Sequence, residues 1–129
     1  DSTFKANSIK FARKVLGYSW ICNYASKSAA VSAVPEYLSG FSMEDSGRVM
    51  TFANRPNSTI YSVETPDGLA PASDSAKTIL KYRDTRISAG IRYDAGTYRT
   101  VCIGFPVETL QQPEAIYDII SSSLKYFAL

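Results

Sequence analysis

Three carboxylates stand at the ends of apolar runs or in turns, where they could carry out chemistry. Glu64 follows the run 59–63, Asp67 stands in a turn, and Glu108 follows the run 101–107. Proteins of the α/β class place their sites at such strand ends. A pair of carboxylates can act as general acid and base when burial raises the pKa of one of them. The candidate catalytic residues are therefore Glu108 with Glu64 or Asp67. The alternative is that Asp67 stabilises its own turn and that Glu108 caps neighbouring backbone.

The chain contains no histidine, which removes several kinds of catalysis. Without an imidazole there is no Cys-His pair, no Ser-His-Asp triad and no histidine-based metal site on this chain. No serine stands in a G-x-S-x-G motif, and the glycines follow the needs of turns rather than a phosphate-binding loop. We expect no cofactor and no metal, and the balance of these observations is against an enzyme.

Four tyrosines could form an aromatic platform for a sugar ring: Tyr61, Tyr82, Tyr93 and Tyr98. The alternative for all four is core packing and cross-strand pairing, because they stand in or beside predicted strands. The candidate ligand-binding residues are Glu108, Asp67 and Tyr93.

The composition is typical of a globular domain and gives little sign of nucleic acid or membrane as a partner. Fourteen basic and twelve acidic residues give a net charge of +2. That charge is too small to predict binding to nucleic acid. No run of residues is apolar enough to cross a membrane. Cys22 and Cys102 lie 80 positions apart. They are either two thiols or one disulfide, and their apolar neighbours favour buried thiols.

Two helices are predicted near the ends of the chain. The first covers 8–16, where Ile9, Ala12 and Leu16 share one face and Gly17 stands at the position of a C-terminal cap. The second covers 113–127, with Pro113 in its first turn. Its predicted buried stripe consists of Ile116, Ile119, Ile120, Leu124 and Phe127.

The residues between these helices have the pattern of β-strands separated by turns. Strands are predicted at 18–24, 30–34, 49–52, 59–63 and 78–82, with turns at 54–57 and 65–68 and one helical turn within 35–40. A hairpin is predicted from 88–93 and 98–105, with Gly96 in its turn. The fold class is therefore α/β or α+β, with a mixed sheet and flanking helices. The chain is either a single domain over 1–129 or the C-terminal portion of a larger domain.

The segment 88–129 resembles the end of class I glutamine-amidotransferase-like domains, which have a flavodoxin-like fold. In these domains a hairpin leads into a last strand that ends in G-x-Q-F-H-P-E and is followed by a closing helix. Residues 103–108 read IGFPVE, so Phe105 and Glu108 fit this pattern, whereas Pro106 stands where the family has its catalytic histidine. The form G-F-P-x-E-T looks closer still to domains of secreted bacterial proteins labelled xanthan-lyase-like. Residues 11–26 resemble an earlier segment of the same domains.

The resemblance implies the later part of a three-layer α/β/α sandwich in a secreted or periplasmic bacterial protein. The leading hypothesis is a non-catalytic structural or ligand-binding module of a protein that acts on polysaccharide or cell wall. The alternatives are a carboxylate-based glycan lyase or hydrolase, and a small α+β interaction domain. The expected partners are carbohydrate and either an upstream segment of the same protein or a second copy. The start at Asp1 suggests a processed or trimmed chain.

Overall fold

The computed structural model describes residues 2–55, 57 and 59–128, and these form one sheet with two α-helices. Helix α1 (Ser2–Phe11) continues into a π-helical turn, η1 (Ala12–Leu16), and helix α2 (Pro113–Ala128) ends the described chain. Three short 3-10 turns are η2 (Pro35–Tyr37), η3 (Met43–Gly47) and η4 (Val107–Thr109). The strands are β1 (Tyr18–Cys22), β2 (Ala30–Ala33), β3 (Met50–Thr51), β4 (Gly68–Pro71), β5 (Ala76–Tyr82), β6 (Ser88–Asp94) and β7 (Arg99–Ile103).

The described strands pair in the order β1-β4-β6-β5-β2-β3, and β7 pairs with β6 beside this path. Every pairing between these strands is antiparallel. The predicted α/β or α+β class, with helices flanking a sheet, is confirmed. The expectation that this is the later part of a three-layer sandwich remains a prediction.

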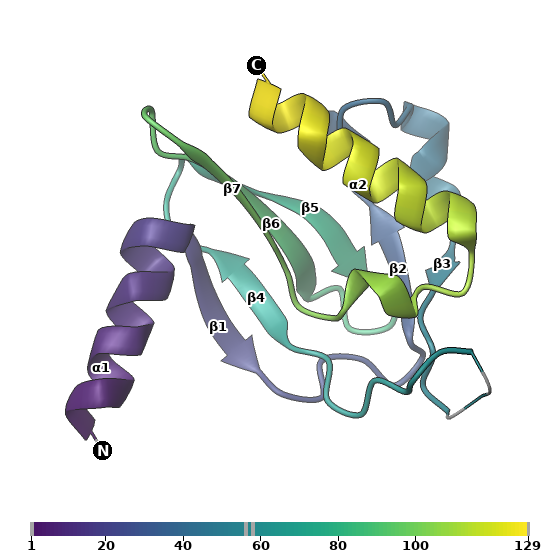
Figure 1. Cartoon of the computed structure of the whole chain (residues 1–129), viewed down its shortest axis with the longest axis horizontal. Coiled ribbons are helices and arrows are strands. Elements are labelled where there is room, and N and C mark those ends of the chain that lie inside the picture. The colour runs from purple at the N-terminus through teal and green to yellow at the C-terminus, as the bar shows by residue number, and fades with distance from the viewer. Residues whose placement is uncertain (1, 56, 58, 129) are drawn as a thin grey trace.

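One face of the sheet packs against α2 and carries most of the core (Figure 1). Val31, Ile79 and Leu80 come from the strands, and Ala115 and Ile119 come from α2. The aromatic part of this core is Phe52, Tyr82 and Phe105. A second, smaller cluster of buried residues contains Leu69, Ala76 and Ile91, with Tyr18 and Tyr93 packed against it.

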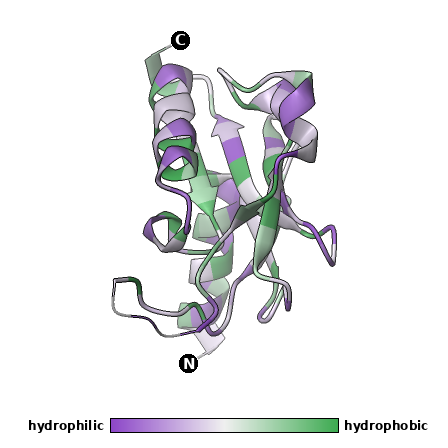
Figure 2. Cartoon of the chain, turned by 90° about the vertical axis from the view of Figure 1, so that its right-hand side faces the viewer, coloured by the Kyte–Doolittle hydropathy of each residue, from purple (hydrophilic) through white to green (hydrophobic). Residues whose placement is uncertain are grey.

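Helix α2 has the predicted extent to within one residue, but only part of its predicted stripe faces the core. Ile119 is buried and Ile116 packs against the core, as predicted. The buried residues of α2 are Ala115, Ile119, Ser122 and Tyr126. Ile120, Leu124 and Phe127, which the predicted stripe included, are exposed. Hydrophobic and hydrophilic residues alternate along this helix (Figure 2), and both buried and exposed residues are among the hydrophobic ones. Periodicity alone therefore could not decide which of the two apolar stripes faces the sheet.

Helix α1 begins at Ser2, earlier than the predicted start at residue 8, and it buries none of its residues. It stands beside β1 rather than over the sheet (Figure 1). The predicted end is confirmed, because Gly17 caps η1 with a left-handed φ of 83°. A side chain here would also collide with the ring of Tyr93, since a Cβ on Gly17 would lie 2.2 Å from that ring. Gly17 is therefore required both for its conformation and for close packing.

Most predicted strands exist, with two errors in the middle of the chain. The predicted strand at 59–63 is absent from the described residues there, because the carboxamide of Asn57 accepts bonds from Thr59 and Ile60 and folds the chain into a turn. The turn predicted at 54–57 includes Pro56, which lies outside the described residues. Strand β4 was not predicted, since its sequence Gly-Leu-Ala-Pro is poor in typical strand residues.

A pair of neighbouring isoleucines tests which face of α2 is buried. Ile119 is 1% exposed and Ile120 is 44% exposed. Ile119→Ala should lower the free energy of unfolding by ~2–5 kcal/mol through the cavity that it leaves. Ile120→Ala should cost about 1 kcal/mol or less. Chemical denaturation of the two variants measures both values, and a larger loss for Ile120→Ala would show that α2 packs through the other stripe.

Candidate functional site

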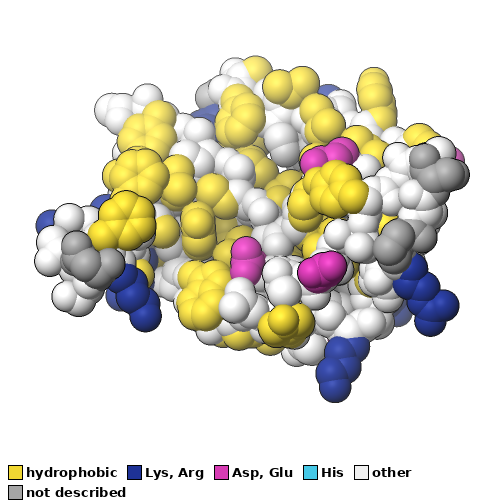
Figure 3. Space-filling model, turned by 60° about the horizontal axis from the view of Figure 1, so that its bottom comes forward, with side chains coloured by type: hydrophobic (Ala, Val, Ile, Leu, Met, Phe, Trp, Pro, Cys, Tyr) yellow, Lys and Arg dark blue, Asp and Glu magenta, His cyan; other side chains and the backbone are white. Residues whose placement is uncertain are grey.

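Three loops meet at one end of the sheet and form what we call the loop rim: residues 23–29, 52–55, 57, 59–67 and 104–112, together with Trp20 of β1, which bonds to Asp67. They lie along the lower edge of Figure 1, at the end of the sheet where β1 and β7 finish. In Figure 3 this edge comes forward, and acidic side chains are interspersed among exposed hydrophobic ones. The candidate residues Glu64, Asp67 and Glu108 all belong to these loops.

The motif Gly104-Phe105-Pro106 connects β7 to the loop rim. Gly104 allows the backbone of Asp67 to approach, since a Cβ on Gly104 would lie 2.2 Å from the Asp67 carbonyl oxygen. The Asp67 N–H donates to the Gly104 carbonyl at 2.8 Å. Phe105 is buried and stacks on Phe52, with ring centroids 4.9 Å apart. Proline cannot continue the ladder, and the chain turns at Pro106 into η4, where it presents Glu108.

Glu108 is exposed and accepts a hydrogen bond of 2.5 Å from the Tyr61 hydroxyl. This bond lowers the pKa of Glu108 and raises the pKa of Tyr61. Glu108 is held in place because residues 109–111 bond to the backbone of Thr51 and Ala53. An exposed carboxylate with a lowered pKa is ionised at neutral pH. Glu108 is therefore suited to accepting hydrogen bonds and unsuited to donating a proton.

Asp67 is half-buried and accepts a hydrogen bond from the indole N–H of Trp20 at 3.2 Å. The backbone of Asp67 is also held by the Tyr82 hydroxyl, which donates to the Asp67 carbonyl at 2.6 Å. Burial raises the pKa of Tyr82, so this buried hydroxyl stays protonated and keeps its role as a donor. The Asp67 side chain thus contacts an exposed aromatic ring, and its role in stabilising its own turn stays a prediction.

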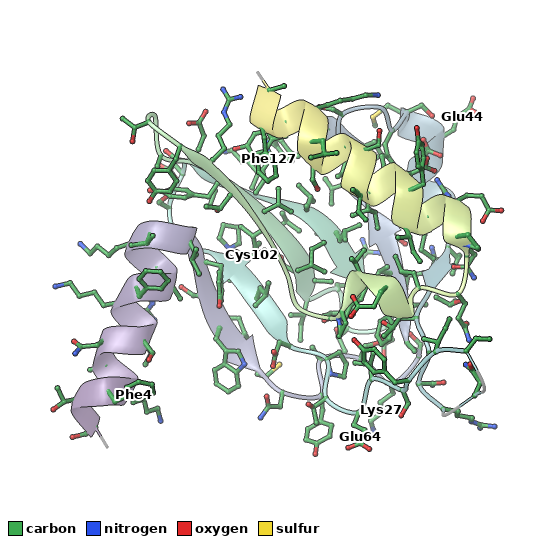
Figure 4. All side chains as sticks on the ribbon, in the orientation of Figure 1. Phe4, Lys27, Glu44, Glu64, Cys102 and Phe127 are labelled. Carbon is green, nitrogen blue, oxygen red and sulfur yellow. The ribbon has the colours of Figure 1, made fainter. Side chains whose placement is uncertain are left out.

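Glu64 lines an open hollow of about 530 Å³ in the loop rim. Tyr24 and Lys27 also line this hollow, and Phe52 and Pro66 contribute apolar surface. Figure 4 shows Lys27 and Glu64 close together at the lower edge of the molecule. The hollow therefore offers a carboxylate, an ammonium group and an exposed aromatic ring to one ligand.

The wall of this hollow at residues 26–28 is held by Asp84, from the turn between β5 and β6. Burial acts to raise the pKa of Asp84, but hydrogen bonds outweigh it and lower the pKa to about 2. The donors are the Lys27 N–H at 2.7 Å, the Ser26 hydroxyl at 2.8 Å and the Ser28 N–H at 3.2 Å. The carboxylate thus satisfies the amides of the loop and fixes its shape.

The structure does not bring Tyr93 to the loop rim. Tyr93 pairs with Thr100 at the turn end of the β6–β7 hairpin, whereas Ala89, four residues earlier on β6, bonds to Gly104. Four residues of strand span about 13 Å. The four tyrosines do not form one platform either, since only Tyr61 belongs to the loop rim. Tyr82 is in the core, and Tyr98 packs edge-on against Tyr93.

Sequence reasoning missed two exposed aromatic residues at the loop rim, Trp20 and Tyr24. Trp20 is 55% exposed and Tyr24 is 70% exposed. Trp20 stands in a strand, where a large aromatic residue is usually buried, so no signal in the sequence indicated its exposure. Tyr24 has a left-handed φ of 55°, a conformation that turns the chain away from the sheet.

Neither cysteine is placed to act as a nucleophile. Cys22 and Cys102 are both free, which excludes the disulfide, and both are half-buried rather than buried. Burial raises the pKa of Cys102, which keeps it as a thiol at neutral pH. Among the described residues, no three histidine, cysteine or acidic side chains are grouped to hold a metal ion.

No family model matches the chain, and no curated protein or solved structure matches it with significance. Neither helix of the described chain combines the length and hydrophobicity needed to cross a membrane.

Tyr61→Phe tests the hydrogen bond that holds Glu108. Without the hydroxyl donor, the pKa of Glu108 should rise towards the ~4.3 of an unperturbed glutamate. A pH titration followed by NMR of the side-chain carboxyl carbons measures the change. The pKa of Asp84 serves as the internal control, because its donors lie elsewhere and should keep it at about 2. An unchanged Glu108 titration would mean that the bond to Tyr61 does not form in solution.

Cys102 should react slowly with an alkylating reagent in the native protein at neutral pH. Its raised pKa lowers the fraction of reactive thiolate, and its half-buried position restricts the access of the reagent. Mass spectrometry of the labelled peptides should show faster labelling after unfolding in urea. Equal rates in the native and unfolded states would show that the thiol of Cys102 is accessible in the native protein.

Proposed function

We propose that the chain is a non-catalytic module that binds carbohydrate at the loop rim. One observation carries the proposal: the loop rim combines three exposed aromatic rings with three carboxylates. The rings are those of Trp20, Tyr24 and Tyr61, and the carboxylates are those of Glu64, Asp67 and Glu108.

The chemistry of a sugar ring is complementary to such a surface. A pyranose has an apolar face of C–H groups, which can stack on an aromatic ring, and hydroxyls at its edge, which donate to acceptors. Two of the carboxylates lie next to an aromatic ring, as the Trp20–Asp67 and Tyr61–Glu108 bonds show. A sugar that stacks on Trp20 or Tyr61 would thus have a charged acceptor at its edge, and charge-assisted bonds are the stronger ones.

The ionisation state of Glu108 argues against the competing hypothesis of a carboxylate-based lyase or hydrolase. A general acid needs a raised pKa, and the hydrogen bond from Tyr61 lowers the pKa of Glu108 instead. The absence of histidine from the chain removes the commonest alternative proton carrier. A binding role uses the same residues without requiring either carboxylate to be protonated.

The resemblance of the tail to amidotransferase-like domains supports the setting that we propose. That setting is a secreted or periplasmic bacterial protein that acts on polysaccharide or cell wall. Pro106 in place of the family's histidine is consistent with a module that has no catalytic activity. We further propose that the chain associates with an upstream segment of its own protein or with a second copy, because α1 and the outer stripe of α2 leave apolar residues exposed.

Trp20 provides a direct readout, because it is the only tryptophan of the chain. Titration with soluble fragments of polysaccharides and of peptidoglycan should give a saturable change in its fluorescence. Tyr61→Ala and Tyr24→Ala should each weaken binding about five- to twentyfold, which corresponds to the ~1–2 kcal/mol of one lost aromatic contact. Tyr117→Ala is the matched control, since Tyr117 is another exposed tyrosine that belongs to α2 and not to the loop rim.

The same fragments decide between binding and catalysis. Incubation with the chain should release no new reducing ends and no unsaturated product. Turnover that Glu108→Gln abolishes would overturn the proposal in favour of the glycan lyase or hydrolase. Absence of any saturable binding, with all fragments, would favour the small α+β interaction domain.

A further inference from the structure

Strand β1 forms one edge of the described sheet, and it pairs with β4 on one side only. An edge strand presents backbone N–H and C=O groups that can pair with another chain. Proteins usually protect such an edge with a charge, a proline or a covering element. The residues Tyr18–Cys22 contain neither a charged residue nor a proline, so the edge carries no such protection of its own.

A groove of about 300 Å³ lies between this strand and helix α1. Tyr18, Ser19 and Trp20 line it from β1. Tyr18 and Trp20 stand two positions apart on β1, so their side chains share one face of the strand, and Ser19 lies between them. The surface of the groove is mostly apolar, and Ile9 and Ala12 contribute to it from the helical side. The groove therefore follows three successive residues of β1, the strand that pairs with β4 on its other side.

The helical wall of the groove is positively charged. Residues 2–16 include Lys5, Lys10, Arg13 and Lys14 and no acidic residue. Lys5 and Arg13 line the groove itself. Phe4 is exposed on the same helix, and Figure 4 shows it near the free end. The positive charge and the apolar surface of the groove together favour a ligand that has both acidic and apolar groups.

We propose that the groove between α1 and β1 binds an extended segment of another polypeptide, with alternating acidic and apolar residues, which adds to the sheet as a strand beside β1. The backbone of the segment would pair with the edge of β1, as in other strand-addition complexes. Its acidic side chains would meet Lys5 and Arg13, and its apolar side chains would cover Ile9 and Trp20. This surface shares Trp20 with the proposed carbohydrate site, whereas Lys5 and Arg13 belong to the groove alone.

A second copy of this chain fits the groove less well. A symmetric dimer uses the same surface patch on both copies. Pairing β1 with β1 of a second copy would therefore bring two basic segments, each with the four charges of residues 2–16, to one interface. Charge complementarity thus favours a different, acidic partner.

The probe is a synthetic peptide of alternating glutamate and valine, about eight residues long to match an edge strand, titrated at physiological salt so that distant charges are screened. We expect saturable binding, together with slower amide hydrogen exchange at residues 18–22. The double variant Lys5→Glu with Arg13→Glu should bind at least tenfold more weakly. The double variant Lys10→Glu with Lys14→Glu is the matched control, because it makes the same charge change on residues that do not line the groove, and it should change binding less than twofold.

Two further peptides separate strand addition from simple charge attraction. A valine–lysine peptide should not bind, and neither should a glutamate–valine peptide with alternate backbone nitrogens methylated. Equal binding of the methylated peptide, equal weakening by both double variants, or no binding at millimolar peptide would overturn the proposal. Concentration-dependent self-association that protects β1 would assign the groove to a second copy instead. Carbohydrate binding by the Lys5→Glu, Arg13→Glu variant should be unchanged, so the two proposals can fail independently.

Discussion

The close contact between Gly104 and Asp67 is the constraint on which the loop rim depends. It joins the end of β7 to the start of β4 through backbone alone, at a separation that a Cβ would prevent. The Tyr82 hydroxyl, from the centre of the core, fixes the same carbonyl of Asp67. Phe105 then stacks on Phe52 in the core, and this contact holds together the two loops that present Tyr61 and Glu108. The polar surface is thus built directly on the aromatic core.

This arrangement explains the motif Gly-Phe-Pro in physical terms. Its three residues serve three structural purposes, which are close approach, core packing and the end of the strand. None of these purposes requires an active site at the end of β7. The packing of the fold therefore accounts for the motif. The position of Glu108 follows from the framework, and the hydrogen bond from Tyr61 determines its charge state.

Elements that depend on local signals could be predicted from the sequence. Gly17 and Pro113 mark a helix end and a helix start by their backbone chemistry, and the hairpin around Gly96 follows from its turn. Choices that depend on tertiary packing could not. The prediction of the buried stripe of α2 was right for Ile116 and Ile119 and wrong for Ile120, Leu124 and Phe127, because apolar residues extend beyond the buried face. Strand β4 exists through its pairing with β1 rather than through its own propensity.

The same distinction between local signals and tertiary packing applies to the candidate site. The carboxylates could be named because strand ends and turns are visible in the sequence. Their partners could not, because Tyr61 and Glu108 are 47 positions apart, as are Trp20 and Asp67. Only the folded loops bring each ring to its carboxylate. Tyr93 was a candidate for its aromatic character, and its place at the turn end of the hairpin follows from strand register instead.

The bond network of Asp84 has a consequence for how this protein can vary in sequence. Surface turns usually accept insertions and deletions more readily than the elements that they connect. The turn between β5 and β6 is exposed, yet its carboxylate must reach three donors in the loop 26–28, at 2.7, 2.8 and 3.2 Å. One residue more or less would move the carboxylate out of reach and release a wall of the hollow beside Glu64. The length of this turn is therefore as constrained as that of a strand, although Asp84 itself does not line the hollow.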